Sequence, residues 1–106
     1  LLREMSNNDP VLAAAYAQML TRPDPEMRRS GASGLGRAGA AAERHVTALA
    51  RAVTDTDKDV RGFALMAITM LGNKAASARP QVEAALKDPD DWVRGWAMAA
   101  HRQVTR

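Results

Sequence analysis

The segment DTDKDVRGFAL, at residues 55–65, has two further copies in the same chain. It returns as DPDDWVRGWAM at residues 88–98, and a more divergent copy, RPDPEMRRSGA, stands at residues 22–32. The copies begin at positions 22, 55 and 88, so the spacing between them is constant. A fixed period of roughly 20–50 residues is the sequence signature of a repeat architecture. The chain is therefore predicted to contain a little under three units of about 33 residues each.

Each unit carries two helical patterns. An aspartate opens the first pattern, at Asp24, Asp57 or Asp90, where its side chain can cap the amino terminus of a helix. Gly39 and Gly72 follow the first pattern, as is typical of glycines that end a helix in a left-handed conformation. The patterns predict short antiparallel hairpins. Helices are expected over residues 10–21, 25–37, 42–53, 58–71, 76–87 and 91–104, and residues 1–5 are expected to end a preceding helix.

The composition favours helices around an aliphatic core. Of the 106 residues, 46% are hydrophobic but only 4% are aromatic, so Ala, Leu, Val and Met must fill the interior. No apolar run reaches the roughly 18 residues of a membrane helix, so no membrane span is predicted. The chain has no cysteine, which excludes disulfides and thiolate chemistry. A net charge of +3 permits phosphate or carboxylate partners without requiring them. The compartment stays open, with the cytoplasm slightly favoured.

The stretch GLGRAG, at residues 34–39, matches the glycine spacing of a dinucleotide-binding fingerprint. Asp55 stands about 20 residues after Gly34, where such sites place an acid for the ribose. The fingerprint also needs a buried strand that ends at the first glycine, and no strand pattern precedes this one. In the register of the repeat, Gly34 aligns with Ala67. We therefore expect Gly34 and Gly36 to lie late in a helix, where small residues permit close packing. No nucleotide cofactor is predicted.

Other motifs for catalysis or metal binding are incomplete. DTDKDV, at residues 55–60, resembles the start of a calcium-binding loop, but Val60 and Met66 replace the required glycine and glutamate. His45 and His101 are far apart in the sequence with no acid at a matching spacing, and the serines lack a nucleophile elbow. No catalytic, cofactor-binding or metal-binding residue is predicted, and the chain is not expected to be an enzyme.

The repeated residues resemble HEAT repeats, in particular the short HEAT-like units of bacterial proteins. The resemblance rests on DTDKDVRGFA, DPDDWVRGWA and GLGRAG for the first helix, and on RPQVEAALKD, at residues 79–88, for the second. It implies an all-α fold, a right-handed superhelix of about three helical hairpins. It also implies one domain over residues 1–106, as a piece of a longer array. The expected units are residues 22–54 and 55–87, with partial units at about 1–21 and 88–106.

HEAT-like units carry a ladder of aspartates and arginines, six residues apart, along the inside of the solenoid. The resemblance assigns this role to Asp55 with Arg61 and to Asp88 with Arg94. The first complete unit departs from the pattern, because Arg22 stands where an aspartate is expected before Arg28. Its rung is in doubt unless Asp24 substitutes for the missing acid.

In HEAT-like proteins the second helix of each unit lines the concave side, so its outward residues are candidates for partner binding. These candidates are Gln18, Arg44, Arg51 and Gln81. The predicted function is a non-catalytic protein-interaction or scaffolding module with a rigid concave surface. One alternative is binding of a nucleic-acid backbone through the concave arginines, although two arginines form no stripe and this face has no aromatic residue to stack a base. Another alternative is an accessory domain of a larger enzyme.

Trp92 breaks the repeat, because Glu26 and Asp59 occupy its position in the other units. It is a candidate exposed anchor for a partner, or it packs half-buried against a next unit. Trp96 shares its position with Phe63, which favours a packing role between units. The arginines of the first helices that are expected to face outward are Arg29, Arg37 and Arg102.

Overall fold

The structure is a computed structural model that describes residues 9–106 as a row of helices. The elements are α2 (Pro10–Met19), α3 (Pro25–Arg37), the 3-10 segment η1 (Gly39–His45), α4 (Val46–Ala52), α5 (Lys58–Leu71), the 3-10 segment η2 (Gly72–Ala78), α6 (Arg79–Ala85) and α7 (Asp91–Val104). Residues 9–106 contain no β-strand, and the all-α prediction is confirmed. The helix end expected at residues 1–5 lies outside the described residues.

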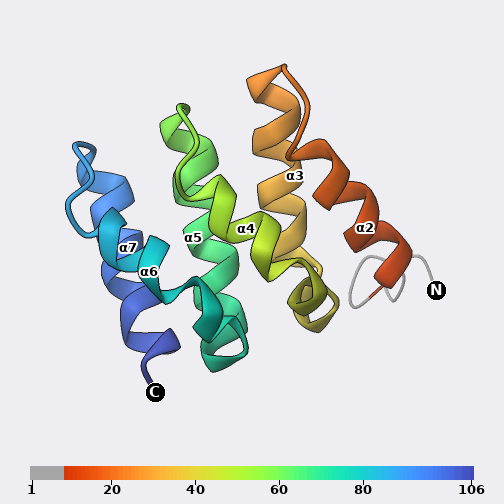
Figure 1. The fold of residues 1–106 in the computed structure, drawn as a ribbon. Helices are drawn as coiled ribbons and strands as arrows, with labels where there is room; N and C mark the ends of the chain where they lie inside the picture. Colours follow the sequence, from red (N-terminus) through yellow and green to blue (C-terminus); the bar gives the residue numbers. More distant parts are fainter. Residues whose placement is uncertain (1–8) are drawn as a thin grey trace.

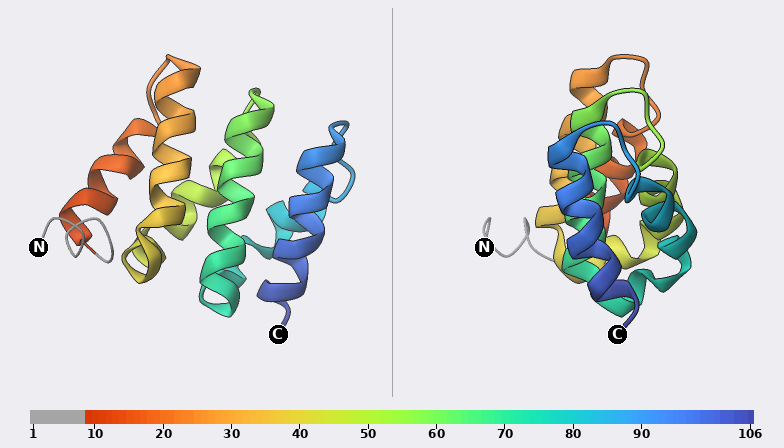
Figure 2. Two further views of the ribbon diagram at one scale, coloured as in Figure 1. Left: turned by 180° about the vertical axis from the view of Figure 1, so that it is seen from behind. Right: turned by 90° about the vertical axis from the view of Figure 1, so that its left-hand side faces the viewer.

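The helices form two layers. The longer first helices of the units, α3, α5 and α7, stand side by side in one layer, which we call the first-helix layer (Figure 2). Helices α2, α4 and α6 face the viewer in Figure 1 and, with the segments η1 and η2 that lead into α4 and α6, form the second-helix layer. Helix α5 packs between α3 and α7. The units therefore stack in the order of the chain, which is the arrangement of a solenoid.

Aliphatic side chains fill the space between the layers. The largest fully buried side chains are Leu35, Leu49, Val60, Leu65, Ile68, Val82 and Val93. They belong to one continuous cluster that runs from α2 to α7, and no polar or charged residue between positions 9 and 106 is buried. The core of Ala, Leu and Val predicted from the composition is confirmed, but the expected contribution of Met is wrong for residues 9–106, where every methionine is at least partly exposed.

The first helices begin at the aspartates that the sequence predicts. Asp57 Oδ2 accepts a hydrogen bond from the backbone N–H of Val60 at 3.0 Å, and Asp90 Oδ2 accepts one from Val93 at 3.0 Å. Asp24 caps α3 through a bond from the Glu26 N–H at 3.0 Å. Each carboxylate pairs a donor that the helix itself leaves free and lies at the positive end of the helix dipole. The predicted amino-terminal caps are confirmed.

The glycines at 34–39 serve the helix and its end. Gly39 and Gly72 both have φ of 62°, which confirms that the chain takes a positive φ at the glycine after each first helix. Gly34 lies within α3, where a Cβ atom would come 2.3 Å from the Tyr16 ring of α2. The close packing predicted for Gly34 is confirmed. At Gly36 a Cβ would meet Ala67 at 3.8 Å, which is an ordinary contact, so close packing does not require glycine there.

The second helices are shorter than the sequence predicts. The continuous helices expected over residues 42–53 and 76–87 are each divided into a 3-10 segment and an α-helix of seven residues. Neither α4 nor α6 has a side-chain cap at its amino terminus, and Pro80 lies in the first turn of α6. Because proline has no N–H to give to a preceding turn, the α-helix begins there instead of continuing η2.

Candidate functional site

Two arginine–aspartate ion pairs tie successive units together. Arg28 Nε and Nη2 donate to Oδ2 and Oδ1 of Asp55 at 2.9 and 3.3 Å. Arg61 Nε and Nη2 bind Asp88 in the same way, at 2.7 and 3.1 Å. The four side chains are at most 16% exposed. Because each contact has two points, it fixes the orientation of one unit on the next as well as their distance.

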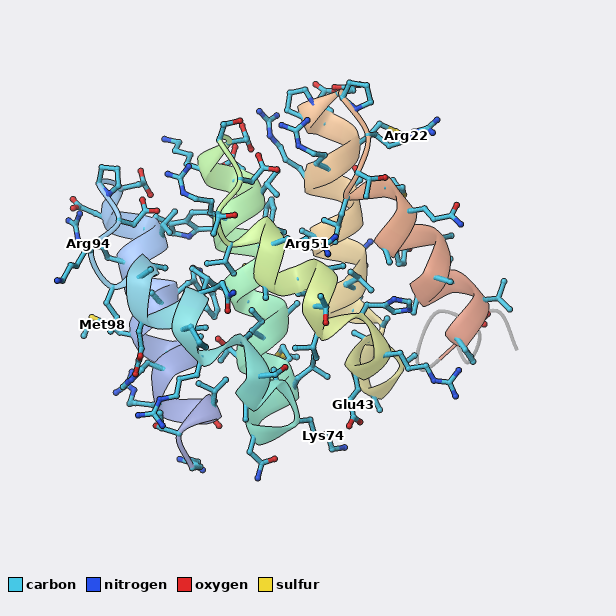
Figure 3. The ribbon with its side chains drawn as sticks, viewed as in Figure 1. Arg22, Glu43, Arg51, Lys74, Arg94 and Met98 are labelled. Carbon is cyan, nitrogen blue, oxygen red and sulfur yellow. The ribbon has the colours of Figure 1, made fainter. Side chains whose placement is uncertain are left out.

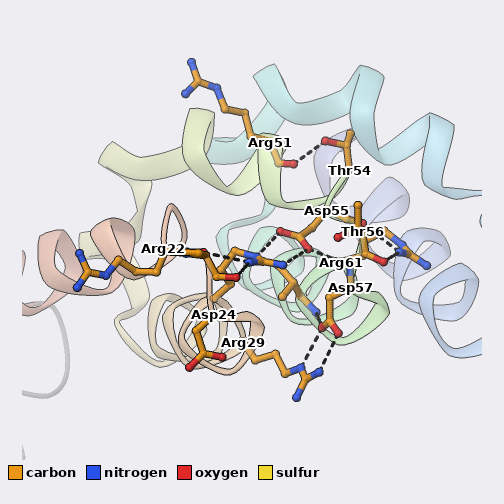
Figure 4. A network of polar contacts seen from close by, with 12 residues as sticks. Arg22, Asp24, Arg29, Arg51, Thr54, Asp55, Thr56, Asp57 and Arg61 are labelled. Carbon is orange, nitrogen blue, oxygen red and sulfur yellow. Dashed lines mark hydrogen bonds and ion pairs between the residues drawn. The ribbon is translucent and has the colours of Figure 1, made fainter.

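The same arginines hold their own turns through backbone carbonyls. Arg61 Nη1 donates to the carbonyl of Asp55 at 3.0 Å, and Arg28 Nη1 donates to the carbonyl of Arg22 at 3.0 Å (Figure 4). The contact expected within a unit, Asp55 with Arg61, therefore runs through the backbone of the aspartate. Its carboxylate serves the arginine of the preceding unit.

Arg22 consequently does not disrupt the first rung, in which Arg28 binds Asp55. Every residue has a backbone carbonyl, so an arginine at position 22 supports Arg28 as an aspartate would. The carboxylate of Asp24, the suggested substitute, caps α3, and the Arg28 guanidinium binds Asp55 instead. The sequence left this rung uncertain because the spacing of the residues does not show whether Arg28 binds a carboxylate of its own unit or of the next.

Asp88 is the most shielded carboxylate of the ladder, with 8% of its side chain exposed. Burial opposes its ionisation, but the hydrogen bonds from Arg61 and from the Asp90 N–H outweigh this and lower the pKa of Asp88 below its ordinary value. The rung between α5 and α7 is therefore an ion pair of two charged groups.

At α7 the ladder takes a different form. Arg94 Nη1 donates to the Asp88 carbonyl at 2.6 Å, so the expected pair of these residues is again a backbone contact. Arg94 Nη2 contacts the exposed carboxylate of Asp91, three residues earlier in the same helix. Between residues 9 and 106, no carboxylate from a further unit reaches Arg94. Figure 3 shows Arg94 with Met98 at the edge of the array formed by α7.

A second group of ion pairs lies beside the ladder. Arg29, expected to face outward, binds both oxygens of Asp57 at 3.0 and 2.8 Å and approaches Asp59 at 3.6 Å (Figure 4). The hydrogen bond from Arg29 lowers the pKa of Asp57 to about 2. Lys58 and Asp90 form a looser pair at 3.7 Å between α5 and the next turn. Arg29 is thus partly exposed but bound to the following unit.

Trp92 packs backward, onto the unit that precedes it. A Cβ atom at Gly62 of α5 would lie 2.0 Å from the Trp92 ring, so the ring occupies the space that glycine leaves. Phe63 meets the same ring edge to face, with centroids 5.6 Å apart and planes at 84°. The side of Trp92 away from α5 stays open, and 41% of the residue is exposed. Trp92 is therefore a packing residue between two units of the described chain.

The candidate residues of the second-helix layer differ in exposure. Gln18, Arg44 and Arg51 are exposed, and neither arginine forms an ion pair within residues 9–106. Figure 4 shows the Arg51 guanidinium pointing away from the polar network. Gln81 is partly buried, and its Oε1 is shielded without accepting a hydrogen bond from the protein. The four residues come from α2, η1, α4 and α6, with no hydrogen bond joining them.

The first-helix layer has an apolar hollow that sequence reasoning missed. It encloses about 200 Å³ and is lined by Ser33, Gly36, Arg37, Phe63, Met66, Met70 and Trp96. Met66 and Met70 lie four residues apart on α5, away from the buried stripe that includes Ala64 and Ile68. That offset from the core positions was the available signal, because large apolar residues outside the buried stripe must face water or a partner.

The described residues contain no candidate metal centre. No group of three or more His, Asp or Glu side chains between positions 9 and 106 is placed to hold a metal ion. His101 lies 3.4 Å from Glu83, whose pKa is lowered by the hydrogen bond from Arg79 and by His101. No helix in the described part of the chain is long and apolar enough to cross a membrane.

Comparisons with known proteins agree with the architecture. A family model described as HEAT repeats matches residues 3–102. Among solved structures, the crystal structure of an engineered protein is similar to this chain, with a TM-score of 0.78 at 21% sequence identity. The alignment covers 88% of this chain and 45% of that one, so this chain spans less than half of the engineered protein. At this identity the likeness concerns the fold alone. No curated protein matches.

Proposed function

Because this chain belongs to the HEAT repeat family, we propose that it acts as a rigid, non-catalytic scaffold that binds a protein partner. The observation that carries the proposal is the pair of two-point ion pairs, Arg28 with Asp55 and Arg61 with Asp88, above a continuous aliphatic core. These contacts order the surface before a partner arrives, so binding does not have to offset the entropy of ordering loops.

The second-helix layer is one proposed binding surface. Gln18, Arg44 and Arg51 are exposed there and remain available for hydrogen bonds, with Gln81 at its edge. A hollow of about 160 Å³ lies between α2 and α4, lined by Leu20, Thr21, Ala48, Arg51, Ala52 and Asp55. This mixture of aliphatic, hydroxyl and charged groups supports a protein partner over a nucleic acid, because no aromatic ring lines the hollow to stack a base.

Photo-crosslinking tests the class of partner. A photo-reactive amino acid at Arg51, in cells that make the natural protein, should give adducts that a protease removes and a nuclease does not. The same amino acid at Lys74, exposed in η2, is the matched control and should give no such adduct. Nuclease-sensitive adducts at Arg51 would favour the nucleic-acid alternative. Equal labelling from both positions would remove support for this surface.

Salt dependence separates the two classes independently. Arg44 and Arg51 together can neutralise about two phosphates, so log affinity for DNA should fall with log salt with a slope of only about −2. We expect no measurable DNA binding near physiological salt in a fluorescence titration. Micromolar binding with a slope of about −5 or steeper would instead favour nucleic-acid binding over the scaffold function, provided that the double substitution of Arg44 and Arg51 to Ala weakens it.

A further inference from the structure

All four aromatic side chains of this protein lie outside its buried core. Tyr16, Phe63 and Trp96 are partly exposed and Trp92 is 41% exposed, whereas the core is aliphatic. An aromatic side chain stabilises a protein or a complex most when it is fully buried. The four partly exposed rings could therefore contribute further by burial against a partner. Surfaces that bind proteins are enriched in aromatic residues, Met and Arg.

The hollow of the first-helix layer collects these residue types. Phe63, Met66 and Met70 come from α5, Trp96 comes from α7, and Arg37 stands on α3. Met70 is 74% exposed although its surroundings are apolar. The flexible methionines can adjust to the shape of an inserted side chain. At about 200 Å³ the hollow is smaller than the roughly 300–1,000 Å³ of small-molecule sites, which favours a single bulky side chain as its occupant.

Arg37 supplies a charge at the edge of the hollow. Its Nη1 donates to Ser33 Oγ at 2.8 Å, and its guanidinium carbon lies 6.0 Å from the centroid of the Tyr16 ring. Within residues 9–106 it forms no ion pair. The acids of α3, α5 and α7 all lie in the first turn of each helix, at Glu26, Asp59 and Asp91. The remainder of these helices therefore offers a cation without an opposing carboxylate.

We propose that this hollow docks an acidic peptide segment of a protein partner, with a bulky apolar side chain over Phe63, Met66 and Met70 and a carboxylate on Arg37. The inference rests on the proposed scaffold function and names the chemistry of one partner and its surface. A membrane surface is the less suitable occupant, because the apolar residues line a concavity instead of protruding into a bilayer.

Selection from a random peptide library displayed on phage, against the intact chain, tests the inference. Enriched peptides should combine Leu, Phe or Trp with Asp or Glu. For a fluorescein-labelled representative, Arg37→Glu and Met70→Glu should each weaken binding by about tenfold or more. Replacing the acids of the peptide by Lys should restore binding to the Arg37→Glu variant. Thermal unfolding by circular dichroism checks that each variant is folded.

Two matched controls use exposed positions elsewhere. Met98→Glu changes an exposed methionine of α7 that does not line the hollow, and Arg51→Glu reverses a charge in the second-helix layer. Both should bind the peptide as the parent chain does. Equal losses in Met98→Glu and Met70→Glu, enriched peptides without acids, no enriched peptide, or binding to vesicles of anionic phospholipid in place of peptides would each overturn the inference. Peptides that depend on Arg51 alone would overturn it while leaving the scaffold function standing.

Discussion

The two junctions between first helices use the same pair of positions for different chemistry. Between α3 and α5 the positions hold Arg29 and Asp59, 3.6 Å apart, with Asp57 completing the ion pair. Between α5 and α7, one repeat later, they hold Gly62 and Trp92, and the indole ring fills the space above the glycine. One backbone arrangement thus accepts either charges or an aromatic ring beside a constant arginine–aspartate rung. The rung, which both junctions share, sets the geometry, and the neighbouring pair is free to vary.

The largest expected effect is at the shared rung. Arg61→Ala would leave the Asp88 carboxylate, 8% exposed, without its two guanidinium donors, and should lower the free energy of unfolding by about 3 kcal/mol. Arg28→Ala should cost less, because the neighbouring pair of Arg29 and Asp57 still holds the first junction. Urea denaturation of both variants measures the difference. A larger loss in Arg28→Ala would contradict the view that the first junction has a second electrostatic support.

A swap between the junctions tests their equivalence. Gly62→Arg forces a side chain into the space of the Trp92 ring, and Trp92→Asp removes that ring's packing, so each should cost about 1–3 kcal/mol. The double variant recreates the first junction and should recover at least about 1 kcal/mol of coupling. Gly95→Arg is the control, because a Cβ there meets nothing within 4 Å. It should be neutral or slightly stabilising. Additive single effects would show that the positions do not interact across the junction.

Acid should weaken the ion pair of Arg29 and Asp57 at the first junction but not the packing of Trp92 on Gly62 at the second. The pKa of Asp57 is lowered to about 2 from 3.8, so the folded state favours the carboxylate. This contribution is complete above about pH 4 and is lost as the pH falls through the folded pKa near 2. The stability difference between the parent chain and Arg29→Ala should therefore shrink as the pH approaches 2. Unfolding curves between pH 2 and pH 6 measure it, and a constant difference would refute the pairing.

The smallest expected effect is at Lys58 and Asp90. Their atoms are 3.7 Å apart and the lysine side chain is 62% exposed, so solvent and side-chain entropy offset most of the attraction. Lys58→Ala should change the free energy of unfolding by less than about 0.5 kcal/mol. A thermal shift comparable to that of Arg61→Ala would show that this exposed pair also fixes the second junction.

The sequence period predicted the helices and their caps because both depend on local contacts. Asp57 lies beside the helix that it caps, so its role can be read from neighbouring residues. The partner of Arg61 is different: Asp55 lies six residues before it and Asp88 lies 27 after it, and only the stacking of units places the second carboxylate on the guanidinium. The packing of Trp92 was similarly hidden, although Gly62 opposite it could have been found by comparing the two units position by position.

The hollow and the exposure of Gln81 depend on the distances between helices, which cannot be derived from the period of the sequence. Met70 is an apolar residue at helical spacing, which is ordinarily a sign of core, yet it is 74% exposed because the buried stripe of α5 passes through Ala67 and Ile68. Gln81 aligns with Ala48 and Ala15 in the other units, and these small residues give no sign that its side chain is shielded. Assigning either to a surface requires the packed structure.

The arginine–aspartate rungs give the array a direction, because the arginine of each unit binds the carboxylate of the following unit. That polarity bears on how the segment of residues 9–106 would associate with itself, because an end-to-end stack of two such segments in the same register would bring Arg22 of one to the place where Arg94 of the other lacks a carboxylate. Two like charges would meet there, so end-to-end growth of this segment into a fibre is opposed at that contact. Arg22→Asp removes the mismatch and keeps the carbonyl that Arg28 uses. Sedimentation velocity should then show association that increases with concentration.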